Sequence, residues 1–193
     1  SNNIRVMSFE GTSWVPVGTP GFSAGSASYT SLFIDNGTPY VAYSDAGNSG
    51  KATVMSFEGT NWVPVGTPGF SASTSSYTSL SVYNGAPYVA YTDGGNSDEA
   101  TVMSFEGTSW IPVGTPGFSA GVAYFPSLFI YNGTPYVAYK DTVNGFHATV
   151  MSFEGTSWAP VGTAGFSTGT AAFPSLRIYN GAPYVAYMNQ DLS

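Results

Sequence analysis

The segment at residues 7–23, MSFEGTSWVPVGTPGFS, decides the fold because the chain repeats it three more times. It returns as MSFEGTNWVPVGTPGFS at 55–71, as MSFEGTSWIPVGTPGFS at 103–119 and as MSFEGTSWAPVGTAGFS at 151–167. Successive copies start 48 residues apart, and four such units fill 192 of the 193 residues. A fixed period of this length is typical of solenoids, propellers and repeat arrays.

Each unit contains four short stretches rich in aromatic and β-branched residues, which predict strands. From Tyr29 onward they are YTSLFID, PYVAYS, ATVMSFE and NWVPVG. The first two stretches are separated by Asn36-Gly37, the dipeptide that type I′ hairpins favour, and the last two by a short Glu-Gly-Thr loop. No segment shows the apolar spacing of a helix, so each unit is expected to be a four-stranded antiparallel sheet.

The fourth strand of every unit carries a proline, which cannot donate a ladder hydrogen bond and is therefore expected at a sheet edge. These prolines are Pro16, Pro64, Pro112 and Pro160. A four-stranded sheet of this length, repeated with one protected edge, predicts the blade of a β-propeller. The expected fold is therefore an all-β, four-bladed β-propeller of four-stranded antiparallel blades, forming a single domain over residues 1–193.

The two ends of the chain carry complementary halves of one unit. Residues 1–18 contain a third and a fourth strand, and residues 173–193 contain a first and a second strand. Pairing these halves into a closing blade would close the ring with no exposed blade edge left at the seam. A monomer closed in this way is the first expectation, and two chains that form an eight-bladed ring are the alternative.

The repeated pattern W-x-P-V-G-x-x-G-F-S … S-L … N-G-x-P-Y-V-A-Y-x-D resembles propeller repeats that occur in tandem in secreted and surface proteins of bacteria. The resemblance covers nearly the whole chain. It implies a propeller fold and a secreted or cell-surface location, whereas propellers serve many activities and the resemblance names none of them.

Composition excludes several classes of function. Four basic residues face eleven acidic ones, for a net charge of −7, and this balance disfavours a nucleic-acid partner. No apolar run is long enough to insert into a membrane. Cysteine is absent, which excludes disulfides and thiolate metal sites, while the apolar fraction of 42% is enough for a sizeable core.

Differences between copies gather in two connections. Residues 7–54 and 103–150 differ at twelve positions, and ten of these fall at 26–30 or 44–51. An up-and-down strand order places both connections on one face, and binding residues commonly lie on loops that a rigid frame carries. This long-loop face is the expected binding face, although longer loops also tolerate sequence drift.

Polar residues end the second strand of each unit, at Asp45, Asp93, Asp141 and Asn189. The three aspartates are each followed three residues later by an asparagine, and this pair could hold a sugar hydroxyl. No cofactor is expected, and calcium or another ion in these loops or in the central channel is a weaker possibility. The plainer role for the aspartates is to close their own loops through Asx-type hydrogen bonds.

Aromatic residues enter the first strand of each unit from the same face, at Tyr29, Tyr77, Phe125 and Phe173. An aromatic platform beside an aspartate is the composition that a sugar site uses. These eight residues, four polar and four aromatic, are the candidate ligand-binding set. The tryptophans and the aliphatic residues of the first strand are expected to pack between blades.

An enzyme is disfavoured. Glu10 and its equivalents Glu58, Glu106 and Glu154 repeat in the outer hairpins, where they are expected to be solvated and far apart, unlike the paired carboxylates of glycosidases. His147 is the only histidine and cannot supply a repeated site. The favoured function is a lectin-like, multivalent carbohydrate-binding module for glycans or another cell-surface component, with a protein-interaction or structural module of a larger bacterial surface protein as the alternative.

Overall fold

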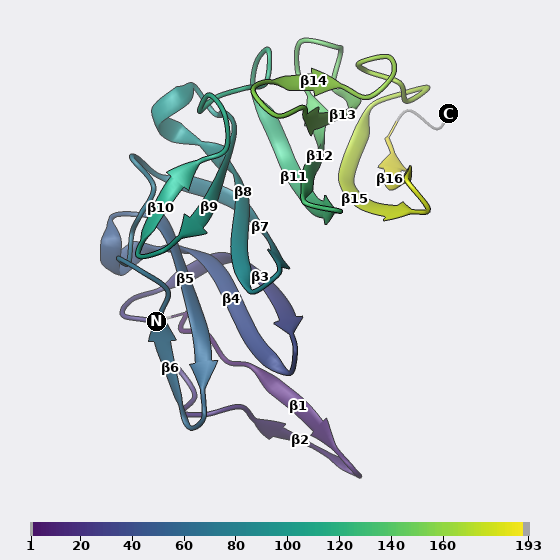
Figure 1. Ribbon diagram of the computed structural model, residues 1–193. Helices are drawn as coiled ribbons and strands as arrows, with labels where there is room; N and C mark the ends of the chain where they lie inside the picture. The colour runs from purple at the N-terminus through teal and green to yellow at the C-terminus, as the bar shows by residue number, and fades with distance from the viewer. Residues whose placement is uncertain (1, 191–193) are drawn as a thin grey trace.

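The computed structural model describes residues 2–190, and nearly all of its regular structure is β (Figure 1). Three sheets have four antiparallel strands each, in the orders β3-β4-β5-β6, β7-β8-β9-β10 and β11-β12-β13-β14, and we call them blades 1, 2 and 3. Two further sheets have two strands each, β1-β2 and β15-β16, which we call the N-half-blade and the C-half-blade. The strands are β1 (Met7–Glu10), β2 (Ser13–Pro16), β3 (Ala27–Asp35), β4 (Thr38–Asp45), β5 (Lys51–Glu58), β6 (Asn61–Pro64), β7 (Ser75–Tyr83), β8 (Ala86–Asp93), β9 (Glu99–Glu106), β10 (Ser109–Pro112), β11 (Ala123–Tyr131), β12 (Thr134–Asp141), β13 (His147–Phe153), β14 (Trp158–Pro160), β15 (Ala171–Tyr179) and β16 (Ala182–Asn189).

The predicted turn and edge signals are confirmed. Asp35 pairs with Thr38 across a two-residue turn, in which Asn36 and Gly37 have φ values of 46° and 83°. Positive φ at both central residues defines the type I′ turn that suits the twist of the flanking strands. The proline strands β6, β10 and β14 lie at the outer edges of their sheets, where a missing N–H costs nothing.

Helical structure in the described residues is limited to two short 3₁₀ turns, η1 (Ala46–Asn48) and η2 (Gly94–Asn96). Each follows the second strand of its blade. None of the helices between residues 2 and 190 has the length and the apolar character needed to cross a membrane.

Consecutive blades pack face to face through apolar side chains. Leu80 of blade 2 is buried in one cluster with Ala42 and Val54 of blade 1. Hydrogen bonds repeat across each junction: the Trp62 indole donates to the carbonyl of Val17 at 2.8 Å, and the next junction has the equivalent bond from Trp110 to Val65. The blades are therefore joined by the same set of contacts each time.

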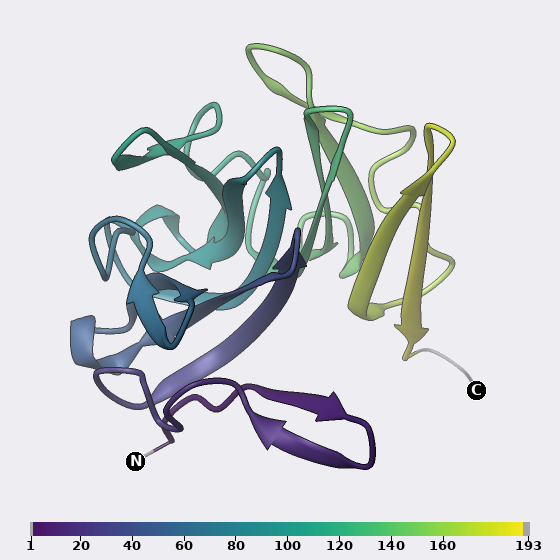
Figure 2. The same cartoon turned by 60° about the horizontal axis from the view of Figure 1, so that its bottom comes forward.

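The ring is open, and this corrects the expectation that the two ends pair in a closing blade. The N-half-blade and the C-half-blade are separate sheets that stand apart in both views (Figures 1 and 2). β1 begins only at Met7, whereas its equivalent β5 begins at Lys51, because residues 3–6 have no strand beside them on the inner side. The single domain over residues 1–193 stays a prediction, and residues 1 and 191–193 lie outside the described residues.

Candidate functional site

The three predicted aspartates are buried at the ends of their strands. Asp45, Asp93 and Asp141 are each 1% exposed. Asp45 accepts hydrogen bonds from the Gly47 amide at 2.9 Å and from the Asn48 side chain at 2.8 Å. The carboxylate therefore closes the loop between the second and third strands of its blade.

The same carboxylate also joins two loops. The hydroxyl of Thr53 donates to Asp45 at 3.1 Å and accepts from the Gly69 amide at 2.8 Å, which ties in the connection to the next blade. The pattern repeats with Thr101 and Thr149. Burial and the adjacent carboxylate raise the pKa of Tyr43 well above its ordinary value. This geometry supports the plainer, loop-closing role, and ligand binding by these aspartates stays a prediction.

Asn189, at the fourth equivalent position, ends β16, where no connection to a third strand follows in the described chain. Ligand binding by Asn189 stays a prediction, as it does for the three aspartates.

The four predicted aromatic residues form a row around the inner strands. Ring centroids are 4.6 Å apart for Tyr29 and Tyr77, 4.5 Å for Tyr77 and Phe125, and 4.3 Å for Phe125 and Phe173. The row borders an apolar cavity of about 450 Å³ that also contains Pro126 and is lined mainly by the first strands. The structure thus brings the aromatic residues together, but they pack on one another and the aspartates lie in separate loops.

The aromatic row has an unusual backbone. Tyr29, Tyr77, Phe125 and Phe173 have φ between 49° and 54°, a left-handed conformation that bulky residues rarely adopt. The register of β3 and β4 shifts between Ser28 and Ser31, so each residue of the row occupies a β-bulge.

A second recurring site lies between blades and was not predicted as a site. At the junction of blades 1 and 2, a pocket of about 300 Å³ is bordered by Tyr40, Glu58, Val65, Pro87 and Phe105. At the junction of blades 2 and 3, the equivalent residues border a pocket of about 260 Å³, and they are Tyr88, Glu106, Val113, Pro135 and Phe153. Each pocket joins one carboxylate and one phenol from the first blade to an aromatic ring from the next.

A glycine fixes the floor of each interblade pocket. A Cβ on Gly66 would lie 2.6 Å from the Phe105 ring, and Gly66 also has a φ of +70°. Gly114 makes the same close approach to Phe153. Only glycine lets the two blades come this close, because any side chain would push the aromatic ring out of the pocket.

Hydrogen bonding and charge set the chemistry of the pocket. The Ser104 hydroxyl donates to the Glu106 carboxylate at 3.2 Å, and Glu106 is otherwise exposed. Burial, followed by the charge of Glu106, raises the pKa of Tyr88 above its ordinary value, and burial, Asp35 and Glu58 do the same for Tyr40. The phenols therefore remain protonated donors at neutral pH, next to a carboxylate acceptor.

The repeating glutamates were visible in the sequence, but their neighbours were not. Glu58 and Phe105 are separated by about one repeat in the chain and meet only because blades stack side by side. The pocket could have been predicted from the 48-residue period, because stacked blades bring residues about one repeat apart next to each other. The prediction that the glutamates are solvated is confirmed by their exposure.

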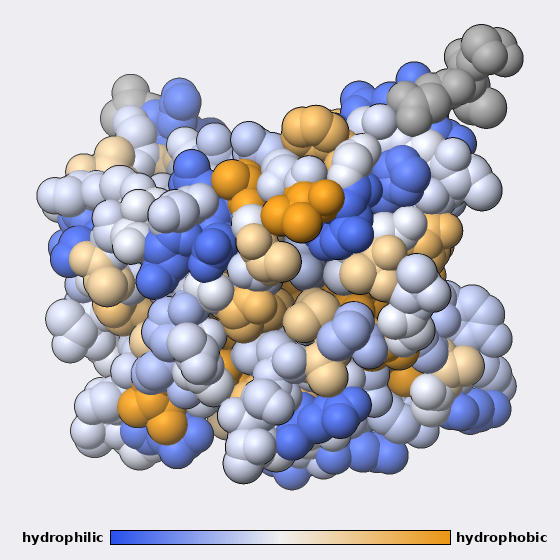
Figure 3. Space-filling view, turned by 90° about the horizontal axis from the view of Figure 1, so that it is seen from above, coloured by the Kyte–Doolittle hydropathy of each residue, from blue (hydrophilic) through white to orange (hydrophobic). Residues whose placement is uncertain are grey.

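The remaining polar candidates do not assemble into a reactive centre. The Nδ1 atom of His147, at the start of β13, lies 3.3 Å from the carbonyl of Gly165, in the connection between β14 and β15. Among residues 2–190, no group of three or more acidic or histidine side chains is placed to hold a metal ion. The surface in Figure 3 is mostly pale, as expected where only 8% of residues are charged and weakly polar side chains dominate.

Comparison with known proteins identifies the fold. No family model matches the chain, and no curated protein matches it in sequence. Similar solved structures include the SapL1 lectin in complex with α-methyl fucoside, with a TM-score of 0.65 and 16% identity over 98% of this chain and 67% of that one. The lectin of Aleuria aurantia in complex with Fucα1-6GlcNAc has a TM-score of 0.61 and 13% identity over 97% of this chain and 64% of that one.

An α-L-arabinofuranosidase from Clostridium thermocellum is also similar, with a TM-score of 0.52 and 19% identity over 89% of this chain and 67% of that one. The chain thus spans about two thirds of the length of these proteins. At this level of identity the likeness establishes the β-propeller fold, which both binding proteins and enzymes use.

Proposed function

We propose that the protein is a non-enzymatic recognition module that binds glycans through its interblade pockets. The observation that carries this proposal is the repetition of one acid–phenol–aromatic pocket at two successive blade junctions. A flat ring with a few oriented polar groups suits the apolar face and the hydroxyls of a sugar. The lectins with the same fold bind fucosides, which supports a sugar as the ligand class.

Repeated weak sites suit the display of several sugars on one surface. Linked sites raise avidity by roughly 10²- to 10⁴-fold when they can engage together. A secreted or surface-displayed protein would meet such glycans, in agreement with the resemblance to bacterial surface repeats. We assign no catalysis, because near-identical pockets supply symmetric groups whereas glycoside hydrolysis needs two carboxylates in different roles.

The pocket can be tested by conservative substitution on a glycan array. The quadruple variant Tyr40→Phe, Glu58→Gln, Tyr88→Phe and Glu106→Gln keeps the shape of both pockets but removes the phenol donors and the charged acceptors. Loss of a hydrogen bond to a charged group costs about 1.5–3 kcal/mol, so we expect binding of array glycans to fall about 10- to 100-fold. The near-ultraviolet circular dichroism spectrum should stay unchanged.

A matched variant, Tyr29→Ala with Tyr77→Ala, tests the site that the sequence favoured. It should leave array binding within a few-fold of the unaltered protein. Binding that survives the pocket variant but is lost in the Tyr29 and Tyr77 variant would move the site to the aromatic row. A protein that binds nothing on the array would favour the protein-interaction alternative.

A further inference from the structure

The two half-blades are complementary in sequence as well as in strand number. β16 carries the sequence APYVAY, which is also that of β8, and β8 pairs with β9 in blade 2. The residues that match the TVMSFE of β9 in the N-half-blade are RVMSFE, from Arg5 to Glu10. In the repeat, β16 corresponds to β8 and residues 5–10 correspond to part of β9. The N-half-blade therefore has the sequence of the third strand that would pair with β16.

The faces at the two ends are apolar and uncovered. Leu32 and Ile34 of β3 are 52% and 53% exposed, whereas their equivalents in β11 are 3% and 7% exposed. Trp14 is 66% exposed against 9% for Trp62. On the C-half-blade, Tyr184 and Met188 are likewise exposed. In the later repeats, the equivalents of Leu32, Ile34 and Trp14 are buried or half-buried.

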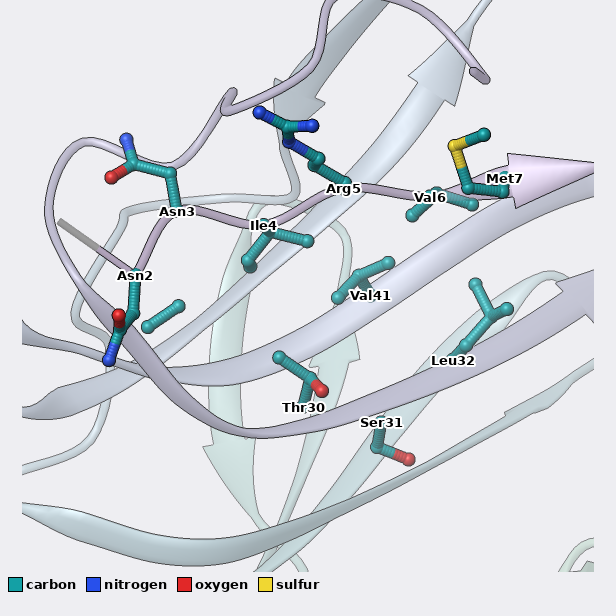
Figure 4. A pocket seen from close by; sticks show the side chains of 11 residues that line it. Asn2, Asn3, Ile4, Arg5, Val6, Met7, Thr30, Ser31, Leu32 and Val41 are labelled. Atoms are coloured by element: carbon teal, nitrogen blue, oxygen red, sulfur yellow. The ribbon is translucent and has the colours of Figure 1, made fainter. Parts of the chain in front are cut away.

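A cavity marks the place of the missing strands. It has a volume of about 440 Å³ and lies between residues 2–7 and the face of blade 1, with Leu32 and Ser31 along one border and Val41 between (Figure 4). In blades 1 to 3, the third strand pairs with the second strand of its own sheet, whereas β1 pairs only with β2. The cavity is thus the space that a C-half-blade would fill.

We propose that a second copy of this chain supplies that half-blade, so that two chains form a closed eight-bladed ring with two composite blades. The arrangement of the ends argues against closure by the chain's own end, because the N-half-blade and the C-half-blade are separate sheets that stand apart (Figures 1 and 2). Two copies together have enough strands for eight four-stranded blades, and propellers typically have four to eight blades. Head-to-tail contacts that close after two copies leave no half-blade edge unpaired at the seams.

The repeat specifies the contacts between copies. Val137 is opposite Met151 in blade 3, so Val185 of one copy lies opposite Met7 of the other. The Leu176 amide donates to Ser127 at 3.0 Å, and the equivalent bond runs from Leu32 to Ser175 of the second copy.

The side chains at the outer part of the junction follow the same rule. Trp158 donates to the carbonyl of Val113 at 2.8 Å and stacks on Phe118 at 4.0 Å. By the repeat, Trp14 of one copy donates to Val161 and stacks on Phe166 of the other. These contacts cover the apolar side chains that the single chain leaves exposed.

The second copy also completes two binding pockets. A Cβ added to any of the three equivalents of Gly162 would meet a phenylalanine of the next blade, whereas at Gly162 nothing lies within 4 Å of that position. By the repeat, Phe9 of the second copy occupies the position of the missing phenylalanine. Tyr184 of one copy similarly provides the phenol beside Glu10 of the other. The proposed assembly does not depend on the proposed function. The inference that the second copy completes two glycan-binding pockets does rest on that function.

Light scattering tests the assembly on the unmodified chain. We expect twice the chain mass of 20.1 kDa. The variant Leu32→Asp places a charge in the junction and should halve the measured mass with unchanged β content. Val143→Asp, at an equally exposed apolar residue of a loop, should leave the mass at two chains. A mass of one chain for the unmodified protein would overturn the proposal.

Disulfide formation distinguishes pairing between chains from pairing within one. The chain has no cysteine, so a Val185→Cys chain and a Met7→Cys chain each carry one thiol. After the two are unfolded together, refolded and oxidised, we expect a covalent product that contains both chains, and little covalent product from either chain alone. If the mixture gives none, whereas a single chain with both cysteines forms an internal disulfide and remains one chain in mass, the ring closes within the chain and the proposal is wrong.

Discussion

Replacing Asp45, Asp93 and Asp141 together by alanine is expected to unfold the protein at 25 °C. Each carboxylate is 1% exposed and accepts bonds from a loop amide, an asparagine and a threonine. Buried donors left without an acceptor cost about 1–3 kcal/mol each, and three such networks together approach the about 5–15 kcal/mol that stabilises a whole domain.

The single variant Asp93→Ala should lower the free energy of unfolding by about 3 kcal/mol. For a domain of this size, that loss corresponds to a drop of roughly 10 °C in Tm, measured by circular dichroism. Substituting the exposed Glu10, Glu58, Glu106 and Glu154 by glutamine is the control and should leave Tm almost unchanged. A triple aspartate variant with an unaltered Tm would mean that the loops do not depend on these carboxylates.

The second large effect is expected from Trp158→Ala, which removes the anchor between blades 2 and 3. The indole stacks on Phe118 with ring centroids 4.0 Å apart and an interplanar angle of 11°, and its N–H donates to Val113 at 2.8 Å. Truncation of a large, well-packed aromatic side chain costs about 3–5 kcal/mol.

Trp158→Phe separates packing from hydrogen bonding at the same position. It keeps a ring against Phe118 but loses the donor, so we expect a cost of about 0.5–1.5 kcal/mol. Urea unfolding of the two variants measures both values. Equal losses for alanine and phenylalanine would show that the hydrogen bond, and not the stacked ring, holds the blades together.

Local features of the fold could be predicted from the sequence because they depend on neighbouring residues. The Asn36-Gly37 turn and the proline edge strands follow from backbone conformations that few residues permit. The number of strands in each blade followed from the 48-residue repeat. The closure of the ring did not, because it depends on the angle between successive blades, which many small packing contacts set together.

In the candidate site, too, some features could be predicted from the sequence, and others depend on contacts between residues far apart in the chain. Predicting that Tyr29 and Tyr77 gather was possible because repeat-equivalent residues of the first strand must lie around one axis. The pocket of Tyr40, Glu58 and Phe105 could not be read from one unit, since its walls come from two blades and Gly66 sets their spacing. The burial of Asp45 was likewise hidden, because its partner Thr53 lies on the next strand, β5, and itself accepts a hydrogen bond from Gly69 in the connection to the next blade.

The most direct test of the account is a crystal structure of the protein with the glycan that gives the strongest array signal. We predict density for the sugar at both complete junctions, between Tyr40 and Phe105 and between Tyr88 and Phe153, with a sugar hydroxyl bonded to Glu58 or Glu106. Density confined to the aromatic row of Tyr29 and Tyr77, with both junctions empty, would contradict the assignment of the interblade pockets.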